Sequence, residues 1–175
     1  MDIPVYIHYG ATKFIPTKGF PIKNREYFMK PKGGLWASRK NASFGWKDWC
    51  KEEDFRDCDI ANSFEFTFAK QAKIVTISSV KTLYNLPKLE NDRFAWGYSI
   101  DFEKCLHLGI DAIELCWYGD EYCDVAFGDL HYELYGWDCD SIVVLNPDVI
   151  IPLYSSKERV KILSCALESK LVTAT

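Results

Sequence analysis

DCDSIVVLNP, residues 138–147, places two acids directly before the last strong strand signal of the chain. Side chains two positions apart in an extended chain point to the same face, so Asp138 and Asp140 are expected to lie side by side at the mouth of this strand. Two carboxylates held close together repel each other, which is costly unless they bind cations or take part in chemistry. The alternative is that both are solvated turn acids.

The composition is that of an ordinary globular protein. The chain has 175 residues, of which 48% are apolar and 26% are charged, close to the globular average. We expect a single domain spanning residues 1–175 with one buried core. The formal net charge of −4 argues against a protein that wraps nucleic acid with its whole surface, although a local basic patch remains compatible with it.

The cysteines and the N-terminus predict a cytoplasmic protein. The seven cysteines include no CxxC pair, whereas disulfide frameworks and zinc sites need closer or more regular spacing. We therefore expect free thiols in a reducing cytosol and no metal site. The N-terminus has no basic segment followed by an apolar run, so we expect no signal peptide. The longest apolar runs are too short to cross a membrane.

Hydrophobic periodicity predicts more strands than helices. Strands are expected at residues 5–9, 35–38, 64–68, 73–77, 110–115 and 141–145, with 149–153 as an extension of the last. They do not follow the spacing of repeated βαβ units. The fold class is therefore predicted as α+β, with short, mostly antiparallel strands and peripheral helices.

Four helices are predicted from spacing and capping residues. They are expected at 45–55 with Ser43 as the cap, from Ser79 to Leu86, from Ser99 or Asp101 to Leu108 before Gly109, and over 156–169. Residues 10–32 are expected to form a long ordered loop, a kind of segment that is often functional.

Three short motifs follow one another along the chain in an order that indicates a family resemblance. They are HYGAT (8–12) at the end of the first strand, GGLWAS (33–38) followed by FGW (44–46), and DCD (138–140). Together they resemble the ADP-ribosyltransferase superfamily, nearest to its His-Tyr-Glu branch, which includes poly(ADP-ribose) polymerases and diphtheria-type toxins. There, a strand carries His-Gly-Ser/Thr, a glycine-rich turn leads into a strand and an aromatic-bearing helix, and a late strand opens with a catalytic acid. The resemblance spans residues 5 to about 151 and implies an ADP-ribosyltransferase-like fold.

The resemblance implies a site for NAD as a substrate. His8 would hydrogen-bond the nicotinamide ribose, and the backbone of Tyr9 and Gly10 would bind the nicotinamide amide. An imidazole ring carries both a donor and an acceptor, and glycine lets a ligand approach the backbone closely. The alternative for His8 is a core or surface histidine.

The second motif would enclose the nicotinamide ring. The family stacks an aromatic side chain on this ring, and Trp36 and Trp46 are both candidates. Gly34 would belong to the turn, and Ser38 would support the site with a hydrogen bond. The alternatives are core tryptophans and a plain turn serine. Basic residues around the turn would meet the pyrophosphate, unless they form a solvated loop: Lys23, Arg25, Lys30, Lys32 and Arg39.

The acid departs from the family pattern because aspartate replaces glutamate. Some branches carry two acids spaced by one residue, of which the second is catalytic. This pattern favours Asp140 as the catalytic acid, with Asp138 in support. The acid would hold a ribose hydroxyl and stabilise positive charge as the bond to nicotinamide breaks.

The implied function is NAD-dependent ADP-ribosyl transfer to a macromolecular acceptor, with release of nicotinamide. Loops 10–32 and 116–131 would recognise the acceptor. A set of acids in the second loop would repel phosphates and favours a protein over nucleic acid: Asp120, Glu121, Asp124 and Asp129. The alternatives are an inactive NAD- or nucleotide-binding module of the same fold, an NAD glycohydrolase, and a chance resemblance. An RNA 2′-phosphotransferase is disfavoured because the chain has only three histidines.

Overall fold

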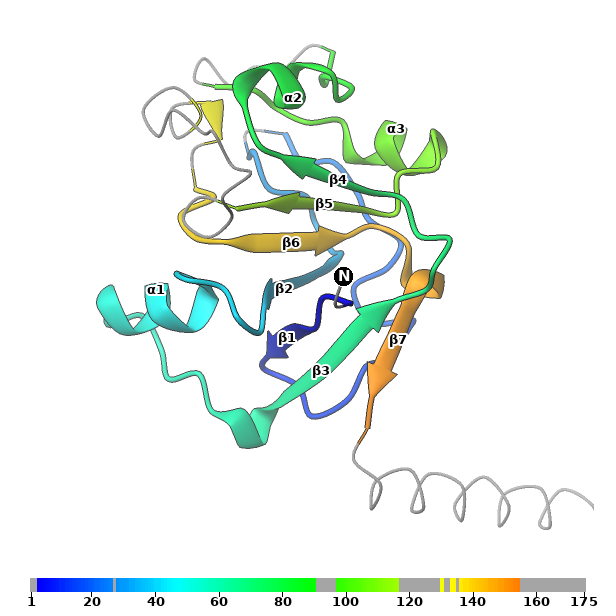
Figure 1. The fold of residues 1–175 in the computed structure, drawn as a ribbon. Helices are drawn as coiled ribbons and strands as arrows, with labels where there is room; N and C mark the ends of the chain where they lie inside the picture. The colour runs from blue at the N-terminus through cyan, green and yellow to red at the C-terminus, as the bar shows by residue number, and fades with distance from the viewer. Residues whose placement is uncertain are drawn as a thin grey trace, which may run out of the picture.

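The computed structural model describes residues 3–26, 28–90, 97–116, 130, 133, 134 and 136–154. Within these residues a seven-stranded sheet has the order β4-β5-β6-β2-β1-β3-β7 (Figure 1). Its strands are β1 (Tyr6–Tyr9), β2 (Leu35–Arg39), β3 (Ser63–Phe68), β4 (Ile74–Ile77), β5 (Ala112–Leu115), β6 (Ser141–Val144) and β7 (Ile150–Leu153). Neighbouring strands are antiparallel except for β4 and β5. The predicted α+β class and the mostly antiparallel pairing are confirmed.

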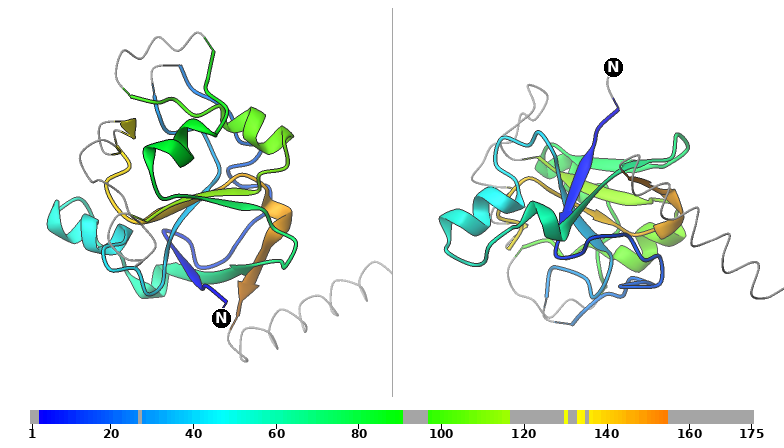
Figure 2. Two further views of the ribbon diagram at one scale, coloured as in Figure 1. Left: turned by 45° about the horizontal axis from the view of Figure 1, so that its top comes forward. Right: turned by 90° about the horizontal axis from the view of Figure 1, so that it is seen from below.

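The helices are short and peripheral. They are α1 (Trp46–Glu52), α2 (Val80–Tyr84) and α3 (Phe102–His107), with 3₁₀ turns η1 (Ile60–Asn62) and η2 (Pro147–Val149). Helices α2 and α3 lie together over the β4–β5 end of the sheet, and α1 lies apart from them (Figure 2). In the described ranges, no helix is long and apolar enough to span a bilayer. The helix predicted over 156–169 lies outside the described residues.

Two of the predicted helix caps are confirmed. The Ser79 hydroxyl accepts a hydrogen bond from the Thr82 N–H at 3.1 Å, and the Asp101 carboxylate accepts one from the Lys104 N–H at 2.9 Å. Each bond satisfies a backbone donor that the first helical turn leaves without an intrahelical partner. Gly109 follows α3 with a φ of +79°, the left-handed conformation that ends many helices.

The predicted boundaries of α1 are wrong. Gly45, not Ser43, is the N-cap residue, and its N–H donates to the Asp48 carboxylate at 2.9 Å. The helix ends at Glu52 rather than Phe55 because Asp54 takes a φ of +47°, which is incompatible with a continuing right-handed helix. Phe55 is therefore carried on the turn that follows the helix.

Alternation along the strands builds a core on each face of the sheet. On one face, Ile113 and Val143 pack with the buried residues of α2 and α3. On the other face, Ala112 and Ile142 pack with the phenylalanines of β3, and loop residues of the segment between β1 and β2 cover them. The predicted alternation of β3 is confirmed, since Phe66 is fully buried while its neighbours are only partly so.

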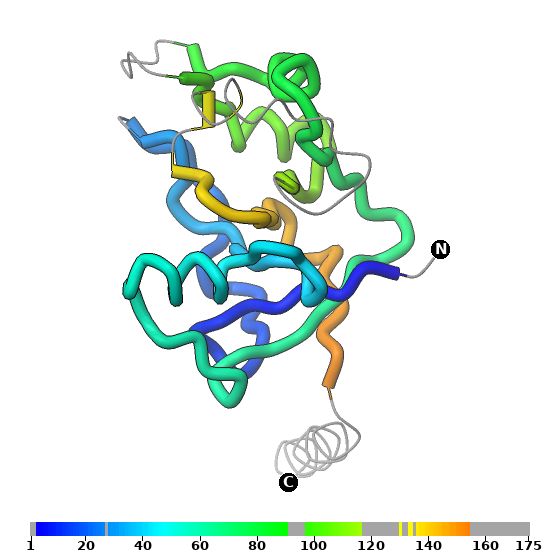
Figure 3. Tube along the Cα trace, turned by 60° about the vertical axis from the view of Figure 1, so that its left-hand side comes forward, coloured from blue at the N-terminus to red at the C-terminus, as the bar shows by residue number. Residues whose placement is uncertain are grey.

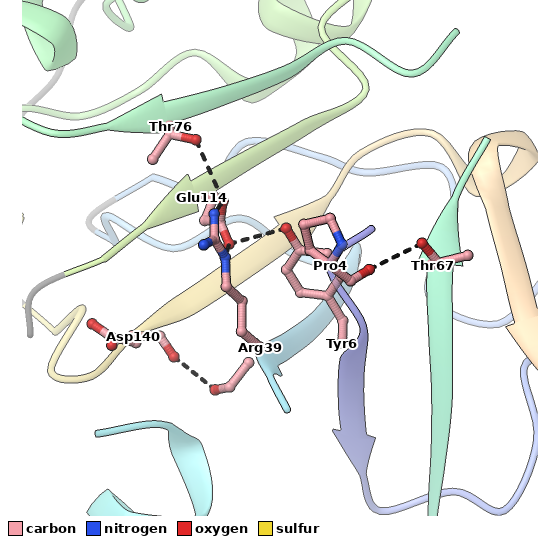
Figure 4. A network of polar contacts seen from close by, with 8 residues as sticks. Pro4, Tyr6, Arg39, Thr67, Thr76, Glu114 and Asp140 are labelled. Carbon is pink, nitrogen blue, oxygen red and sulfur yellow. Dashed lines mark hydrogen bonds and ion pairs between the residues drawn. The ribbon is translucent and has the colours of Figure 1, made fainter. Parts of the chain in front are cut away.

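A buried carboxylate connects four strands across the second face. Glu114 of β5 is 2% exposed, and Arg39 of β2 binds it through two bonds, Nε–Oε1 at 2.7 Å and Nη2–Oε2 at 2.8 Å (Figure 4). The Tyr6 hydroxyl of β1 donates to Oε1 at 3.1 Å, and Thr76 Oγ1 of β4 donates to Oε2 at 3.3 Å. Burial and the Glu114 charge raise the pKa of Tyr6, so its hydroxyl remains a neutral donor.

We expect Arg39→Met to lower the free energy of unfolding by about 3–5 kcal/mol, because it leaves the Glu114 carboxylate buried without its ionic partner. The adjacent Lys40 gives a matched control. Its ion pair with Glu65 spans 2.7 Å, but its side chain is 57% exposed, so Lys40→Met should cost at most about 1 kcal/mol. Urea unfolding measures both. Equal losses in the two variants would contradict the role assigned to the buried carboxylate.

Candidate functional site

A cavity of about 290 Å³ brings together most of the residues that the three motifs predict for the site. It is lined by β1, β2, the first residue of α1 and the segment that opens β6. His8, Tyr9, Trp36, Trp46 and Asp138 line it, together with Ile7, Lys30, Ala37, Arg56, Cys139 and Ser141. Residues separated by more than 100 positions in the sequence thus line one cavity.

His8 is held in one tautomer at the end of β1. Its Nδ1 lies 2.7 Å from the Trp36 carbonyl oxygen, and because a carbonyl only accepts, Nδ1 carries the proton. Burial lowers the pKa of His8, and the nearby charges of Arg56 and Lys18 lower it further, against the opposing effect of the carbonyl. The ring is therefore neutral at neutral pH and keeps Nε2 as an acceptor, which suits a ribose hydroxyl.

Trp36 and Trp46 belong to separate aromatic clusters. Trp36 meets Trp137 edge-on, with the ring centroids 4.9 Å apart, and the Lys30 ammonium lies 5.3 Å from the Trp36 centroid. Trp46 stacks on Trp49 at 5.0 Å, and the Arg56 guanidinium carbon lies 5.4 Å from the Trp46 centroid. Both indoles are only partly buried. Each therefore combines an aromatic wall with a nearby cation.

Ser38 positions Trp46 rather than lining the cavity. Its hydroxyl donates to the Asp140 carbonyl oxygen at 2.7 Å and accepts from the Trp46 backbone N–H at 2.8 Å. A Cβ on Gly45 would come within 3.0 Å of the Ser38 Cβ, so this approach requires glycine. Gly45 and Asp140 also form an isolated parallel bridge, which places the start of α1 beside the start of β6 (Figure 3).

The two acids do not share a face as predicted. Asp138 lines the main cavity, whereas Asp140 lines a separate, smaller hollow of about 60 Å³ with Arg39 and Glu114; Ser141 lines both. The alternation expected of a strand does not extend to Asp138, because β6 begins only at Ser141 and the chain bends at Cys139. Of the two carboxylates, the one described within the main cavity is therefore that of Asp138.

The five basic residues expected around the glycine turn go to different places. Lys30 lines the cavity, while Arg39 does not and instead binds the buried Glu114. Lys23 donates to Glu103 at 2.7 Å, Arg25 stacks on Phe28, and Lys32 is exposed. Only Lys30 of this set is placed to meet a ligand in the cavity.

The two predicted site glycines support the walls and are not among the residues that line the cavity. Gly10 has a φ of +106° and donates its N–H to the Asn62 carbonyl at 2.8 Å. Gly34 has a φ of +73°, and a Cβ there would lie 2.9 Å from Val143 Cγ2. The second glycine therefore lets the turn pack directly on β6.

Arg56, Cys139 and Ser141 are cavity residues that sequence reasoning missed. Arg56 follows α1 in an acid-rich stretch, and nothing in its sequence context indicates that the chain returns to the end of β1. Cys139 and Ser141 flank the second acid; Cys139 lines the main cavity beside Asp138, and Ser141 lines both the cavity and the hollow that Asp140 lines.

Several predictions concern residues outside the described ranges. These are most of the proposed acceptor loop at 116–131, including Asp120, Glu121, Asp124 and Asp129. The cysteines in the described residues are free thiols, as expected. In the same part of the chain, no group of three or more His, Cys, Asp or Glu side chains is arranged to hold a metal ion.

Comparison with known proteins gives no relative from which a function follows. No protein-family model, curated protein or solved structure matches the chain. The functional argument therefore rests on the geometry of the cavity and on the order of the motifs.

We expect Ser38→Ala to destabilise the protein by about 1–3 kcal/mol, because the Trp46 N–H and the Asp140 carbonyl lose a buried partner. The variant should also alter the tryptophan fluorescence of the folded protein, since the hydroxyl fixes the first residue of α1. Ser43→Ala is the matched control because Ser43 is exposed, and it should change stability by less than about 0.5 kcal/mol. If Ser38→Ala behaved like this control in denaturant unfolding, the positioning role would be wrong.

Proposed function

We propose that the chain has an ADP-ribosyltransferase-like fold and transfers ADP-ribose from NAD⁺ to a macromolecular acceptor, releasing nicotinamide. One observation carries the proposal. The histidine of the first motif, the tryptophans of the second and an acid of the third line the same cavity, although nothing in their sequence separation requires it.

The walls suit the nicotinamide end of NAD⁺. The oxidised nicotinamide ring is flat and positively charged, so the faces of Trp36 and Trp46 attract it both by stacking and as a cation. A cation lies near each ring, Lys30 by Trp36 and Arg56 by Trp46. Both tryptophans therefore remain candidates for the stacking residue, and the two cations are the groups nearest to them for the pyrophosphate.

The acid in this proposal is Asp138 rather than Asp140. As the bond to nicotinamide breaks, positive charge builds on the ribose, and a nearby carboxylate stabilises it. Asp138 lines the cavity, whereas Asp140 lines the hollow beside Glu114. His8 Nε2 would accept a hydrogen bond from a ribose hydroxyl and so orient the sugar.

A second candidate is an NAD- or nucleotide-binding module without transfer chemistry. Two observations favour it. The cavity acid is an aspartate, which reaches one methylene less than the glutamate of the resembled family. Lys30 also lies close enough to Asp138 for the carboxylate to raise the pKa of Lys30, against the larger effect of burial. An acid neutralised by a lysine stabilises a developing cation less well. A protein acceptor remains favoured over nucleic acid by the sequence of the 116–131 loop.

Nicotinamide release from NAD⁺ tests the proposal. Wild type should release nicotinamide, and Asp138→Asn should reduce the rate roughly a hundredfold or more, because it removes the charge that stabilises the transition state. Asp140→Asn should act on stability more than on rate, and Asp148→Asn, on an exposed residue, should leave both unchanged.

Three results separate the alternatives. NAD⁺ binding without release, in the presence of candidate acceptors, would favour the binding module. Loss of release in Asp140→Asn but not in Asp138→Asn would reverse the assignment of the acid. A folded protein that neither binds nor cleaves NAD⁺ would contradict the proposed function.

A further inference from the structure

Three aromatic rings form a cluster at α1 that belongs to neither core of the sheet. Trp46 stacks on Trp49 at 5.0 Å between centroids, and Phe55 meets these two rings at 5.9 and 5.5 Å. In the part of the chain that the structure describes, none of the three is among the residues that pack in the two buried clusters of the sheet. The one buried residue of α1 is Cys50. Figure 1 shows this helix at one side of the molecule, away from α2 and α3.

This set of rings, which we call the α1 aromatic cluster, is open to solvent. Phe55 is 59% exposed although its ring packs on two tryptophans. Both indoles are only partly buried. Exposed aromatic side chains that gather in one place mark a surface for association, because a partner that covers them removes apolar area from water.

The chain around the cluster is acidic. Residues 46–60 carry six acids and three bases, and all nine of these side chains are exposed. Two of the acids are used within the chain, Asp48 at the Gly45 N–H and Asp59 at the Ala61 N–H. The other four make no hydrogen bond or ion pair with another described residue: Glu52, Glu53, Asp54 and Asp57.

The acids lie next to the rings. Residues three and four apart on a helix are surface neighbours, so Glu52 and Glu53 flank Trp49. Asp54 directly precedes Phe55 in the sequence. The surface therefore combines aromatic faces with carboxylates that are free to bind a cation.

We propose that the α1 aromatic cluster is a docking surface for a basic, arginine-bearing segment of a partner protein. A guanidinium stacks on an indole face and pairs with carboxylates in the same position. The protein itself contains an example of the first contact, since the Arg56 guanidinium carbon lies 5.4 Å from the Trp46 ring centroid. The acids beside Trp49 supply the second.

The same charges disfavour other occupants. The excess of acids repels nucleic-acid phosphates and anionic lipid head groups. A second copy of the chain would bring the same acidic surface to a symmetric interface. The inference uses the exposed surface of α1 and does not depend on NAD⁺, so it stands or falls separately from the proposed function.

Selection from a library of short random peptides tests the inference, because it needs no known partner. The full chain is immobilised, bound peptides are sequenced, and a selected peptide is labelled with a fluorophore for anisotropy titrations. The selected peptides should be enriched in arginine relative to the library. Selection of peptides without arginine, or of no peptides at all, would overturn the proposal.

A pair of phenylalanine variants locates the binding. Phe55→Ser removes an exposed ring of the cluster and should weaken peptide binding by about tenfold or more. Phe28→Ser is the matched control, because Phe28 is 54% exposed and also carries an arginine over its ring. It should leave binding unchanged, and equal losses in the two variants would contradict the assigned surface.

A pair of charge reversals tests the acids. Glu52→Lys combined with Glu53→Lys should weaken peptide binding by about tenfold or more, because it places like charges beside Trp49. Glu26→Lys combined with Glu90→Lys changes the net charge equally at exposed positions and should have little effect. Equal losses would show general attraction of a basic peptide and would overturn the proposal.

Sedimentation velocity tests the alternative occupant. Wild type should remain at one oligomeric state as its concentration rises. Self-association that Phe55→Ser abolishes would assign the surface to a second copy of the chain and would overturn the proposal.

Discussion

The Glu114 carboxylate is the interaction on which the arrangement of the sheet depends. It is 2% exposed and is bound by groups from β1, β2 and β4. Of these three strands only β4 is adjacent to β5 in the sheet, because β6 separates β5 from β2 and β1. A buried charge is tolerated only where its partners reach it, so the strands must keep one register. A shift of one residue would move Glu114 into the apolar core on the other face.

The same strands line the candidate site: His8 follows Tyr6 by two residues in β1, and Ala37 precedes Arg39 by two residues in β2. In β2, Arg39 points to the carboxylate, while Ser38 bonds the first residue of α1. In β1, Tyr6 belongs to the carboxylate network and Ile7 lines the cavity. Residues of β1 and β2 thus take part both in the buried carboxylate network and in the lining of the cavity. A loss of register would disturb both at once.

Local patterns predicted the elements better than they predicted the site. The alternation in β3, the apolar run of β6 and the caps Ser79 and Asp101 depend on neighbouring residues, and all are as expected. The start and end of α1 were missed because they depend on the close contact of Gly45 with Ser38 and on the left-handed Asp54, which are set by packing. The meeting of His8, Trp36 and Trp46 followed from motif order.

Sequence patterns could not predict where the two acids and Arg56 lie in the structure. Whether Asp138 follows the alternation of β6 depends on the bend at Cys139, which no composition rule indicates. Arg56 reaches the end of β1 only because the turn after α1 brings the chain back. Both are long-range consequences of how β6, β2 and α1 meet.

The most direct measurement is the response of the indole N–H resonances to NAD⁺, with Trp36 and Trp46 assigned by single Trp→Phe variants. The account predicts that these two signals shift together as NAD⁺ is added and that His8→Asn weakens the response. Unchanged Trp36 and Trp46 signals at saturating NAD⁺, in a protein that remains folded, would contradict it.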